Sequence, residues 1–379
     1  MKIVHIISYF QPEFGYEEYY HAIAQANLGH EVYVISSKYY HPLLTNKKRK
    51  LINSDSLEDN ITIIRLKSIE FTYTRQNILL GVKLQINYLQ PDLIYLHGTG
   101  TLLSYYILSN CKNEKIKYVV DTHEDGTYQK RDGIVNTFKD ILITYISNYT
   151  ISKSHLVLFY SEKIKNRYWE IIKKNSINYT VASIGVSCDR FFFDDERRKE
   201  IRKKYNIDKE DFLVVFSGRL VREKKYHNFI ECMIRCKIFF KIMFIGKIDN
   251  EYCRLLIKIW NKYNLNSKDL IFIDNVNSRL LYRYYSAADL GLWISNSSVG
   301  ILEAYACKLP AIINREALFY YPAINEDLIV DLNDYQSALN IIQILAQDNV
   351  LLKSYKEKSV EIAKKYDYKL IAANVIRKI

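Results

Sequence analysis

A cluster of basic residues follows an apolar run near the middle of the chain, in the segment VVFSGRLVREKKYH that begins at Val214. Its four cations lie in the turn after the run and at the start of the next helix: Arg219, Arg222, Lys224 and Lys225. Cations at a helix N-terminus oppose the positive end of the helix dipole, and a bound diphosphate would offset that repulsion. Gly218 lets the backbone turn tightly, and the guanidinium of Arg219 suits phosphate oxygens. A solvated charge cluster is the competing interpretation.

A second segment, LGLWISNSSVGILEAYACKLP at 290–310, combines a strand end, a polar loop and a helix start. The helix is expected to begin close to Val299, with Ser297 or Ser298 as its N-cap. A free helix N-terminus offers unpaired N–H donors and about half a positive charge, which suits a diphosphate. Glu303 lies in the second turn, and its carboxylate could hold the two vicinal hydroxyls of a ribose. A solvated helix residue is the competing interpretation of Glu303.

Motifs of several other enzyme classes are absent from the sequence. It contains no GxxxxGK[ST], HExxH, GxSxG or full GxGxxG pattern, and Gly98-Thr99-Gly100 is only a weak match to the last. No Asp-x-Asp pair is present to hold a divalent metal against a diphosphate, and the eight histidines show no ligand spacing. We therefore expect no metal and no cofactor. The six cysteines form no CxxC pair, which fits a reduced cytosol.

Short apolar runs of strand type recur along the chain, separated by helical patterns. The runs are Ile3–Ser8, Glu31–Ser36, Ile61–Leu66, Leu93–Leu96, Tyr118–Asp121, Leu156–Tyr160, Phe212–Ser217, Ile242–Ile245, Leu270–Ile273, Leu290–Ile294 and Ala311–Ile313. Such runs are typical of buried parallel strands joined by βαβ crossovers. The two series predict an α/β protein of two doubly wound Rossmann-like domains facing a central cleft, with ligands beyond the carboxyl ends of the strands.

The chain has 379 residues, which favours two domains. The composition changes near 183–189, so we place the first domain at 1–184 and the second at 185–360. Residues 361–379 are expected to form a C-terminal helix that packs back on the first domain. The final helical region, about Val350–Ile379, carries an interruption near Tyr366–Tyr368.

Composition limits the class of protein. Hydrophobic residues make up 49% and charged residues 25%, as in soluble globular proteins, and 12 Gly with 5 Pro exclude collagen-like and low-complexity chains. The N-terminal MKIVHIISYF turns polar at once, so we interpret it as a first strand and not as a secretion signal. No apolar run of about 18 residues is present to span a membrane. These observations predict a cytoplasmic protein.

The net charge of +12 draws the protein toward phosphates, in nucleic acid, anionic lipid or small substrates. One interpretation is solubility together with an AT-rich genome. The other is peripheral docking on a negatively charged membrane face, where each nearby Lys or Arg is worth about 1 kcal/mol. Nucleic-acid binding would rest on the charge alone, because no recognition motif accompanies it.

The chain resembles the family 4 (group 1) retaining glycosyltransferases of the GT-B fold over nearly its whole length. The segments that carry the resemblance are FQPEFGYEEYYHAIAQANLGHEVYVISS at 10–37, PDLIYLHG at 91–98, VVDTHED at 119–125, SIGVSCDRF at 183–191, GRLVREKK at 218–225, YYSAADLGLW at 284–293 and LEAYACKLP at 302–310. Each is weak alone, but their order and separations are specific. The resemblance implies an N-terminal acceptor domain and a C-terminal domain for the nucleotide-sugar donor.

The resemblance also implies roles for individual residues. Arg219 and Lys224 match the cations that stabilise the departing diphosphate without a metal, a form of electrostatic catalysis. Glu303 matches the glutamate that holds the nucleotide ribose, and His123 matches a first-domain histidine near the anomeric carbon. The remaining donor-binding positions are Gly218, Ser298 and the backbone amides of Gly300, Ile301 and Leu302. In the first loop, Gly15 matches a glycine that faces donor and acceptor, and Glu18 falls in a Gly-Tyr-x-Glu signature of a related subgroup.

Two departures from the family pattern bear on recognition. Many members carry a glutamate eight residues before the position of Glu303, where it contacts the donor sugar, and here Ser295 stands in its place. The second glycine of the first loop is replaced by Tyr16, which alters the acceptor side. Both departures place recognition of the sugars in question.

The resemblance implies a retaining glycosyltransferase that moves a sugar from a nucleotide-diphosphate sugar to a glycan or lipid-linked acceptor, in bacterial surface polysaccharide biosynthesis. It would be metal-independent, cytoplasmic and peripheral on the inner membrane face, without nucleic acid as a partner. A non-catalytic GT-B subunit that scaffolds a partner transferase is the main alternative, motivated by Ser295. A nucleotide-sugar epimerase of the same architecture would need a set of carboxylates that the sequence does not place.

Overall fold

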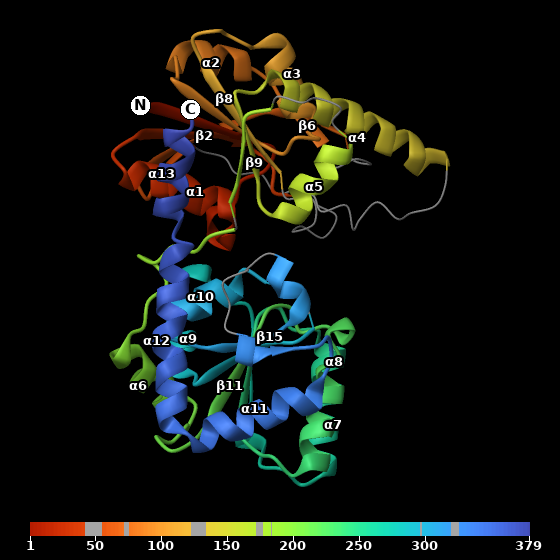
Figure 1. The fold of residues 1–379 in the computed structure, drawn as a ribbon, viewed down its shortest axis with the longest axis vertical. Coiled ribbons are helices and arrows are strands. Elements are labelled where there is room, and N and C mark those ends of the chain that lie inside the picture. The colour runs from red at the N-terminus through yellow and green to blue at the C-terminus, as the bar shows by residue number, and fades with distance from the viewer. Residues whose placement is uncertain are drawn as a thin grey trace. The chain divides into compact units, whose positions relative to one another are not determined.

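The computed structural model describes residues 1–41, 55–71, 76–122, 134–171, 177–182, 184–295, 298–319 and 326–379. It divides the chain into two compact α/β units (Figure 1). Unit 1 comprises Met1–Ile184 together with Tyr368–Ile379, and unit 2 comprises Gly185–Asp367. Each unit is described by itself below.

Unit 1 is built on a sheet with the strand order β10-β9-β8-β7-β1-β2-β4-β3. Its strands are β1 (Lys2–Ile7), β2 (Glu31–Ser37), β3 (Ser56–Glu58), β4 (Ile61–Leu66), β7 (Leu93–His97), β8 (Lys117–Thr122), β9 (Leu156–Phe159) and β10 (Tyr179–Val181). All neighbours pair in parallel except β3, which is antiparallel to β4. The carboxyl ends of the parallel strands therefore share one edge.

The helices of unit 1 are α1 (Glu17–Asn27), α2 (Val82–Leu89), α3 (Leu102–Asn110), α4 (Ile134–Lys153), α5 (Glu162–Ile171) and α13 (Tyr368–Arg377), with the 3₁₀ helix η1 (Pro12–Phe14). All but α13 lie in sequence between strands of the unit. A separate antiparallel hairpin joins β5 (Ser68–Phe71) to β6 (Gln76–Leu79). α13, from the C-terminus, packs beside α1 (Figure 1).

Unit 2 is a second doubly wound sheet, all parallel, in the order β13-β12-β11-β14-β15-β16. Its strands are β11 (Leu213–Ser217), β12 (Lys241–Ile245), β13 (Leu270–Ile273), β14 (Leu290–Trp293), β15 (Ala311–Asn314) and β16 (Ile329–Val330). The α-helices are α6 (Asp195–Lys204), α7 (Tyr226–Cys236), α8 (Asn250–Lys262), α9 (Leu281–Ala287), α10 (Gly300–Ala306), α11 (Tyr335–Gln347) and α12 (Asn349–Lys365). The 3₁₀ helices are η3 (Arg222–Lys224), η4 (Ser267–Asp269), η5 (Ser278–Leu280), η6 (Arg315–Phe319) and η7 (Glu326–Leu328).

Every apolar run that the sequence analysis took for a strand contains one, so the prediction of two Rossmann-like domains is confirmed. The strands that the sequence analysis did not predict are two to four residues long: β3, β5, β6, β10 and β16. The C-terminal boundary differs from the predicted residue 361. α12 runs unbroken to Lys365 and packs on α10 within unit 2, and the chain changes unit only at Tyr368. None of the described helices is both long and apolar enough to cross a bilayer.

A buried ion cluster joins several elements of unit 2. Asp289, which is 6% exposed, lies between α9 and β14. Its carboxylate accepts from Arg198 at 2.7 Å, from Arg202 at 3.2 Å and from the backbone N–H of Leu213 at 3.0 Å, and Lys356 lies 3.4 Å away. Burial alone would raise the pKa of Asp289, but these partners hold it below its ordinary value. The cluster connects α6 and α12 to the start of β11.

We expect Asp289→Ala to lower the free energy of unfolding by about 3–5 kcal/mol, because it leaves buried cations without their shared anion. Urea unfolding measures the change. Asp195→Ala is the matched control, since it removes a solvent-exposed pair with Lys199 on α6, at 2.7 Å, and exposed pairs contribute little. Equal destabilisation by the two substitutions would contradict the role of the cluster.

Candidate functional site

The turn after β11 depends on a glycine. Gly218 has a φ of 126°, a backbone conformation that L-residues rarely adopt. Its N–H donates to the carbonyl of Ile245 at 2.8 Å, which continues the pairing with β12 past the strand end. A Cβ at this position would lie 2.9 Å from Nζ of Lys224. Gly218 therefore permits both the turn and the close approach of the lysine.

Two cations lie together at this turn. Arg219 is exposed and Lys224, at the end of η3, is half-buried. Burial and the charge of Arg219 lower the pKa of Lys224 to about 8. Within the described part of the chain, neither side chain forms an ion pair. Two like charges without an acidic partner make this turn a favourable place for an anion.

Ser295 ties the end of β14 to the same turn. Its hydroxyl donates to the backbone carbonyl of Lys224 at 2.7 Å. The sequence analysis identified Ser295 only as the replacement for a family glutamate. In the structure it fixes the backbone from which the Lys224 ammonium projects.

The start of α10 is linked to the end of β11 through one tyrosine. A Cβ at Gly300 would lie 3.0 Å from the Tyr285 hydroxyl and 3.3 Å from the Trp293 ring. The buried Tyr285 in turn donates to the hydroxyl of Ser217 at 2.8 Å. Gly300 is therefore the position where the helix comes close to Tyr285 and Trp293. Sequence reasoning did not identify Tyr285 as a site residue. A tyrosine among other aromatic residues of a helix gives no sign that its hydroxyl joins two other elements.

The helix start differs from the expected set of free amide donors. The N–H of Gly300 donates to the Ser298 hydroxyl at 3.3 Å. The N–H groups of Ile301 and Leu302 donate to the carbonyls of Ser298 and Val299, at 3.1 and 3.0 Å. A tight turn over these residues thus gives all three amides an acceptor. The N-cap residue of α10 is Val299, without a side-chain cap, and not Ser298 as expected. Ser297 lies outside the described residues.

Glu303 lies one turn into α10 and is only 8% exposed. The interpretation of Glu303 as a solvated helix residue is therefore wrong. Burial raises its pKa to about 8, so most of the carboxyl groups carry a proton at pH 7 and can donate as well as accept. Hydroxyl donors brought to this carboxyl group would favour its ionised form.

The first loop of unit 1 contains the other predicted positions. Gly15, with φ of 63°, closes η1, and its N–H donates to the Pro12 carbonyl at 3.1 Å. Glu18 lies in the first turn of α1 and is half-buried. Burial, together with the charges of Glu17 and Asp121, raises the pKa of Glu18 well above its ordinary value. The predicted His123 lies outside the described residues.

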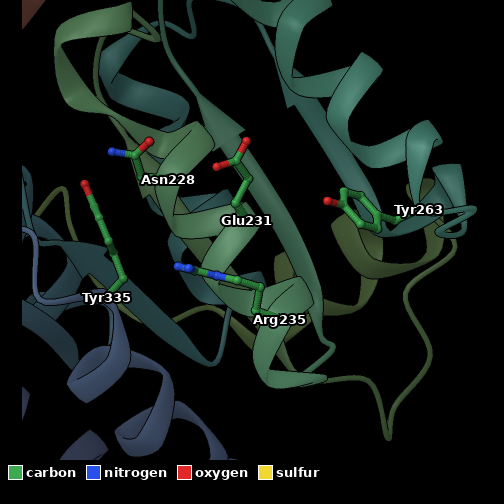
Figure 2. Close-up of a pocket in the computed structure, with 5 residues that line it drawn as sticks. All are labelled: Asn228, Glu231, Arg235, Tyr263 and Tyr335. Atoms are coloured by element: carbon green, nitrogen blue, oxygen red, sulfur yellow. The ribbon is translucent and has the colours of Figure 1, made fainter.

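A hollow of about 450 Å³ lies on another part of unit 2. Figure 2 shows Asn228, Glu231 and Arg235 projecting from α7, with Tyr335 and Tyr263 on either side. None of these lining residues belongs to the predicted site. Among the described residues, no group of three or more His, Cys, Asp or Glu side chains is placed to hold a metal ion.

Residues 197–365 match the model of the family described as glycosyl transferases group 1. This range holds Arg219, Lys224 and Glu303 and covers most of unit 2. Over 238 residues the chain is 27% identical to TuaC of Bacillus subtilis (strain 168), named as a teichuronic acid biosynthesis glycosyltransferase. The alignment covers 59% of this chain, and the chain spans about half (53%) of the length of that relative.

Solved structures resemble the whole chain. Anabaena Alr3699/HepE in complex with UDP has a TM-score of 0.73 at 14% identity, covering 100% of this chain and 99% of that one. A glycosyltransferase from Rickettsia africae has a TM-score of 0.72 at 17% identity, with 99% and 97% covered. Sucrose-phosphate synthase from Thermosynechococcus elongatus has a TM-score of 0.71 at 17% identity, with 100% and 98% covered. These likenesses show the fold, which is that of the GT-B glycosyltransferases.

The lowered pKa of Lys224 predicts how anion affinity depends on pH. Above pH 8 the lysine loses its charge, whereas Lys224→Arg keeps a cation throughout. We expect wild-type affinity for inorganic pyrophosphate, divided by that of Lys224→Arg, to fall about tenfold between pH 7 and pH 9. Isothermal titration of both proteins gives this ratio, in which the titration of pyrophosphate itself cancels. A ratio that stays constant with pH would exclude Lys224 from the anion site.

Proposed function

We propose that the protein is a retaining glycosyltransferase that moves a sugar from a nucleotide-diphosphate sugar to a glycan or lipid-linked acceptor. The observation that carries the proposal is the pair formed by Arg219 and the half-buried Lys224 at the Gly218 turn, without an acidic partner among the described residues. Such a pair is suited to a diphosphate, on which negative charge grows as the bond to the sugar breaks.

Names of similar proteins support the donor class. The HepE structures were solved with UDP and with UDP-glucose, and a similar structure from E. coli holds UDP-2-fluoro glucose. The name of TuaC refers to teichuronic acid biosynthesis. By analogy we propose membership in family 4, a nucleotide-sugar donor for this chain, and a role in bacterial surface polysaccharide biosynthesis at the cytoplasmic face of the membrane.

The arrangement in unit 2 supports separate roles for its residues, some binding the diphosphate of the donor and one binding its ribose. Arg219 and Lys224 would contact the diphosphate oxygens, and their fixed positions avoid reorganisation as charge develops. Glu303 would accept from the two ribose hydroxyls, and its proton would leave as those donors arrive. Because two cations face the departing diphosphate, we propose that transfer needs no metal.

A non-catalytic GT-B subunit remains the second candidate, because Ser295 replaces the glutamate that contacts the donor sugar in many family members. The hydrogen bond from Ser295 to the Lys224 carbonyl favours a working donor site, since it orders the residue that faces the diphosphate. A non-catalytic subunit would bind a nucleotide sugar without breaking the bond between its sugar and its diphosphate. Nucleotide release therefore discriminates between the two candidates.

We expect Arg219→Ala to slow nucleotide release from the donor by about a hundredfold or more, because it removes a charge-assisted contact worth roughly 2–4 kcal/mol in the transition state. The donor base is first identified by thermal-shift titration with UDP, GDP, ADP and their sugar conjugates. A ligand at a concentration about 100 times its dissociation constant adds about 2.7 kcal/mol to the free energy of unfolding. Release is then measured in EDTA.

Arg222→Ala is the matched control, since Arg222 is an exposed cation on η3 in the same turn. It should release nucleotide at nearly the wild-type rate. Equal rates in wild type and Arg219→Ala would overturn the assignment of Arg219. If the wild type binds the nucleotide sugar without releasing its nucleotide, the scaffold candidate is favoured. If nucleotide is released without EDTA but not in its presence, metal independence is overturned.

We expect Glu303→Ala to weaken nucleotide diphosphate binding by about tenfold or more, because the ribose hydroxyls lose an acceptor whose hydrogen bonds are worth roughly 1.5–3 kcal/mol. Pyrophosphate binding, which lacks the ribose, should be unchanged. Isothermal titration of both ligands separates the two effects. Equal weakening for both ligands would show that Glu303 acts on the fold of the site and not on the ribose.

A further inference from the structure

Four buried polar side chains in unit 1 form one hydrogen-bonded chain. The Oε1 atom of Gln25, on α1, lies 2.7 Å from Nε2 of His5, on β1. Nδ1 of His5 lies 2.9 Å from Nε2 of His97, on β7. Nδ1 of His97 lies 2.6 Å from Oδ2 of Asp121, on β8. All four residues are at most 7% exposed, so water does not complete their hydrogen bonding.

The two ends of the chain determine where its protons lie. An amide oxygen and a carboxylate only accept hydrogen bonds, so Nε2 of His5 and Nδ1 of His97 each carry a proton. The contact between the two rings then needs one further proton, because two bare nitrogens would place lone pairs against each other at 2.9 Å. The pair of histidines therefore holds three ring protons, which amounts to one positive charge.

That charge belongs on His97. Burial and the neighbouring His97 lower the pKa of His5 well below its ordinary value, whereas His97 lies directly against the Asp121 carboxylate. His97 with both nitrogens protonated and Asp121 ionised form a buried pair with no net charge. Hydrogen bonds between charged partners of this kind are roughly twice as strong as neutral ones.

Asp121 uses its second oxygen to hold the loop that follows β7. Its Oδ1 accepts from the N–H of Gly98 at 2.9 Å. Gly98 has φ of 97°, and a Cβ there would lie 2.6 Å from Thr101, the N-cap of α3. The Asp121 carboxylate thus connects the end of β8 to the turn into α3.

The same two strand ends are connected on their other side by Tyr168, on α5. Its hydroxyl lies 2.8 Å from the hydroxyl of Thr99 and 3.2 Å from that of Thr122. The last residues of β8 are therefore fixed through both Asp121 and Thr122.

We propose that His97 is a positioning residue, which holds Asp121 as one half of a buried charged pair and so fixes the carboxyl ends of β7 and β8 for sugar transfer. This inference rests on the proposed function, because the chain carries no reaction of its own. It adds His5, Gln25, His97 and Asp121 to the residues on which turnover depends, although none of them belongs to the donor half of the site in unit 2.

Other titratable groups surround the chain in unit 1. His21, on α1, lies with its ring centroid 6.1 Å from His5, and burial lowers its pKa to about 3, so it stays neutral. Tyr95 stacks on both His5 and His97, and its pKa is raised by burial. The charge of Asp121 contributes to the raised pKa of Tyr160 and of Glu18. Glu18 is therefore the neighbour whose protonation changes when Asp121 loses its charge.

The proton count is tested directly on the wild-type protein by nitrogen NMR of its histidines, which number eight. At pH 7 the expected result is His97 with both nitrogens protonated and His5 with a proton on Nε2 alone. A single proton on His97 would overturn the proposal, and it would mean that the Gln25 amide presents its nitrogen to His5. This measurement does not depend on activity.

The positioning role is tested with Asp121→Asn, which keeps the shape of the side chain. Its amide oxygen can still accept from Gly98, and its amide nitrogen then donates to His97, which has to become neutral. We expect kcat for nucleotide release to fall about tenfold, with donor affinity within twofold of wild type. A loss of kcat at unchanged donor affinity is a result that a general loss of structure would not give.

Because the charge of Asp121 helps to raise the pKa of Glu18, the comparison is repeated in a Glu18→Gln background, in which that effect is absent. Asp92→Asn is the matched control in unit 1, because Asp92 is exposed and its carboxylate accepts only from the backbone N–H of Lys2 among the contacts described. The kcat of Asp92→Asn should equal that of wild type. An unchanged kcat for Asp121→Asn, or equal losses of kcat and donor affinity, would overturn the role of His97. Loss of nucleotide binding in the wild type would instead count against the proposed function.

Discussion

The Lys224 ammonium group is held against the backbone of Gly218 and within electrostatic range of the Arg219 guanidinium. Burial and like charge both disfavour its protonated form, which is why its pKa falls to about 8. The left-handed turn at Gly218, the 3₁₀ turn η3 and the hydrogen bond from Ser295 all serve to keep the lysine there. A lysine whose pKa is lowered by burial and by a neighbouring cation is typical of functional sites. An anionic substrate would offset the repulsion between the two cations.

The proposed donor site and the hydrophobic core of unit 2 are built from the same elements. β11 and β14 are central strands of the sheet, and the turns after them carry Lys224 and Ser295. Tyr285 extends the core to the surface by joining Ser217 to the start of α10. A rigid sheet thus sets the distance between the cations and Glu303, as preorganised electrostatics requires.

Much of this arrangement could be predicted from the sequence. Continuous Val/Ile/Leu runs identified the central strands because parallel strands are buried on both faces. The cations after β11 and the helix start near Val299 were visible as local patterns. The short strands β3 and β16 were missed, since two or three residues at a sheet edge carry no periodic signal.

Other features depend on tertiary contacts that one sequence does not reveal. The sequence left Glu303 open between a ribose-binding carboxylate and a solvated helix residue, and only the packing of α10 shows that it is buried. His5 and His97 each sit within apolar strand runs, so nothing in the pattern links them to Gln25 or to each other across 92 residues. The bond from Ser295 to the Lys224 carbonyl likewise joins residues 71 positions apart.

The central claim is that the Arg219 and Lys224 pair exists to hold a diphosphate. The most direct test compares the affinities of nucleoside diphosphates and monophosphates with the same base, in wild type and in the Arg219→Ala, Lys224→Met double variant. We predict that the diphosphate binds wild type roughly tenfold or more tightly than the monophosphate, and that the double variant loses this preference. Equal affinities for the two nucleotides in the wild type would contradict the account.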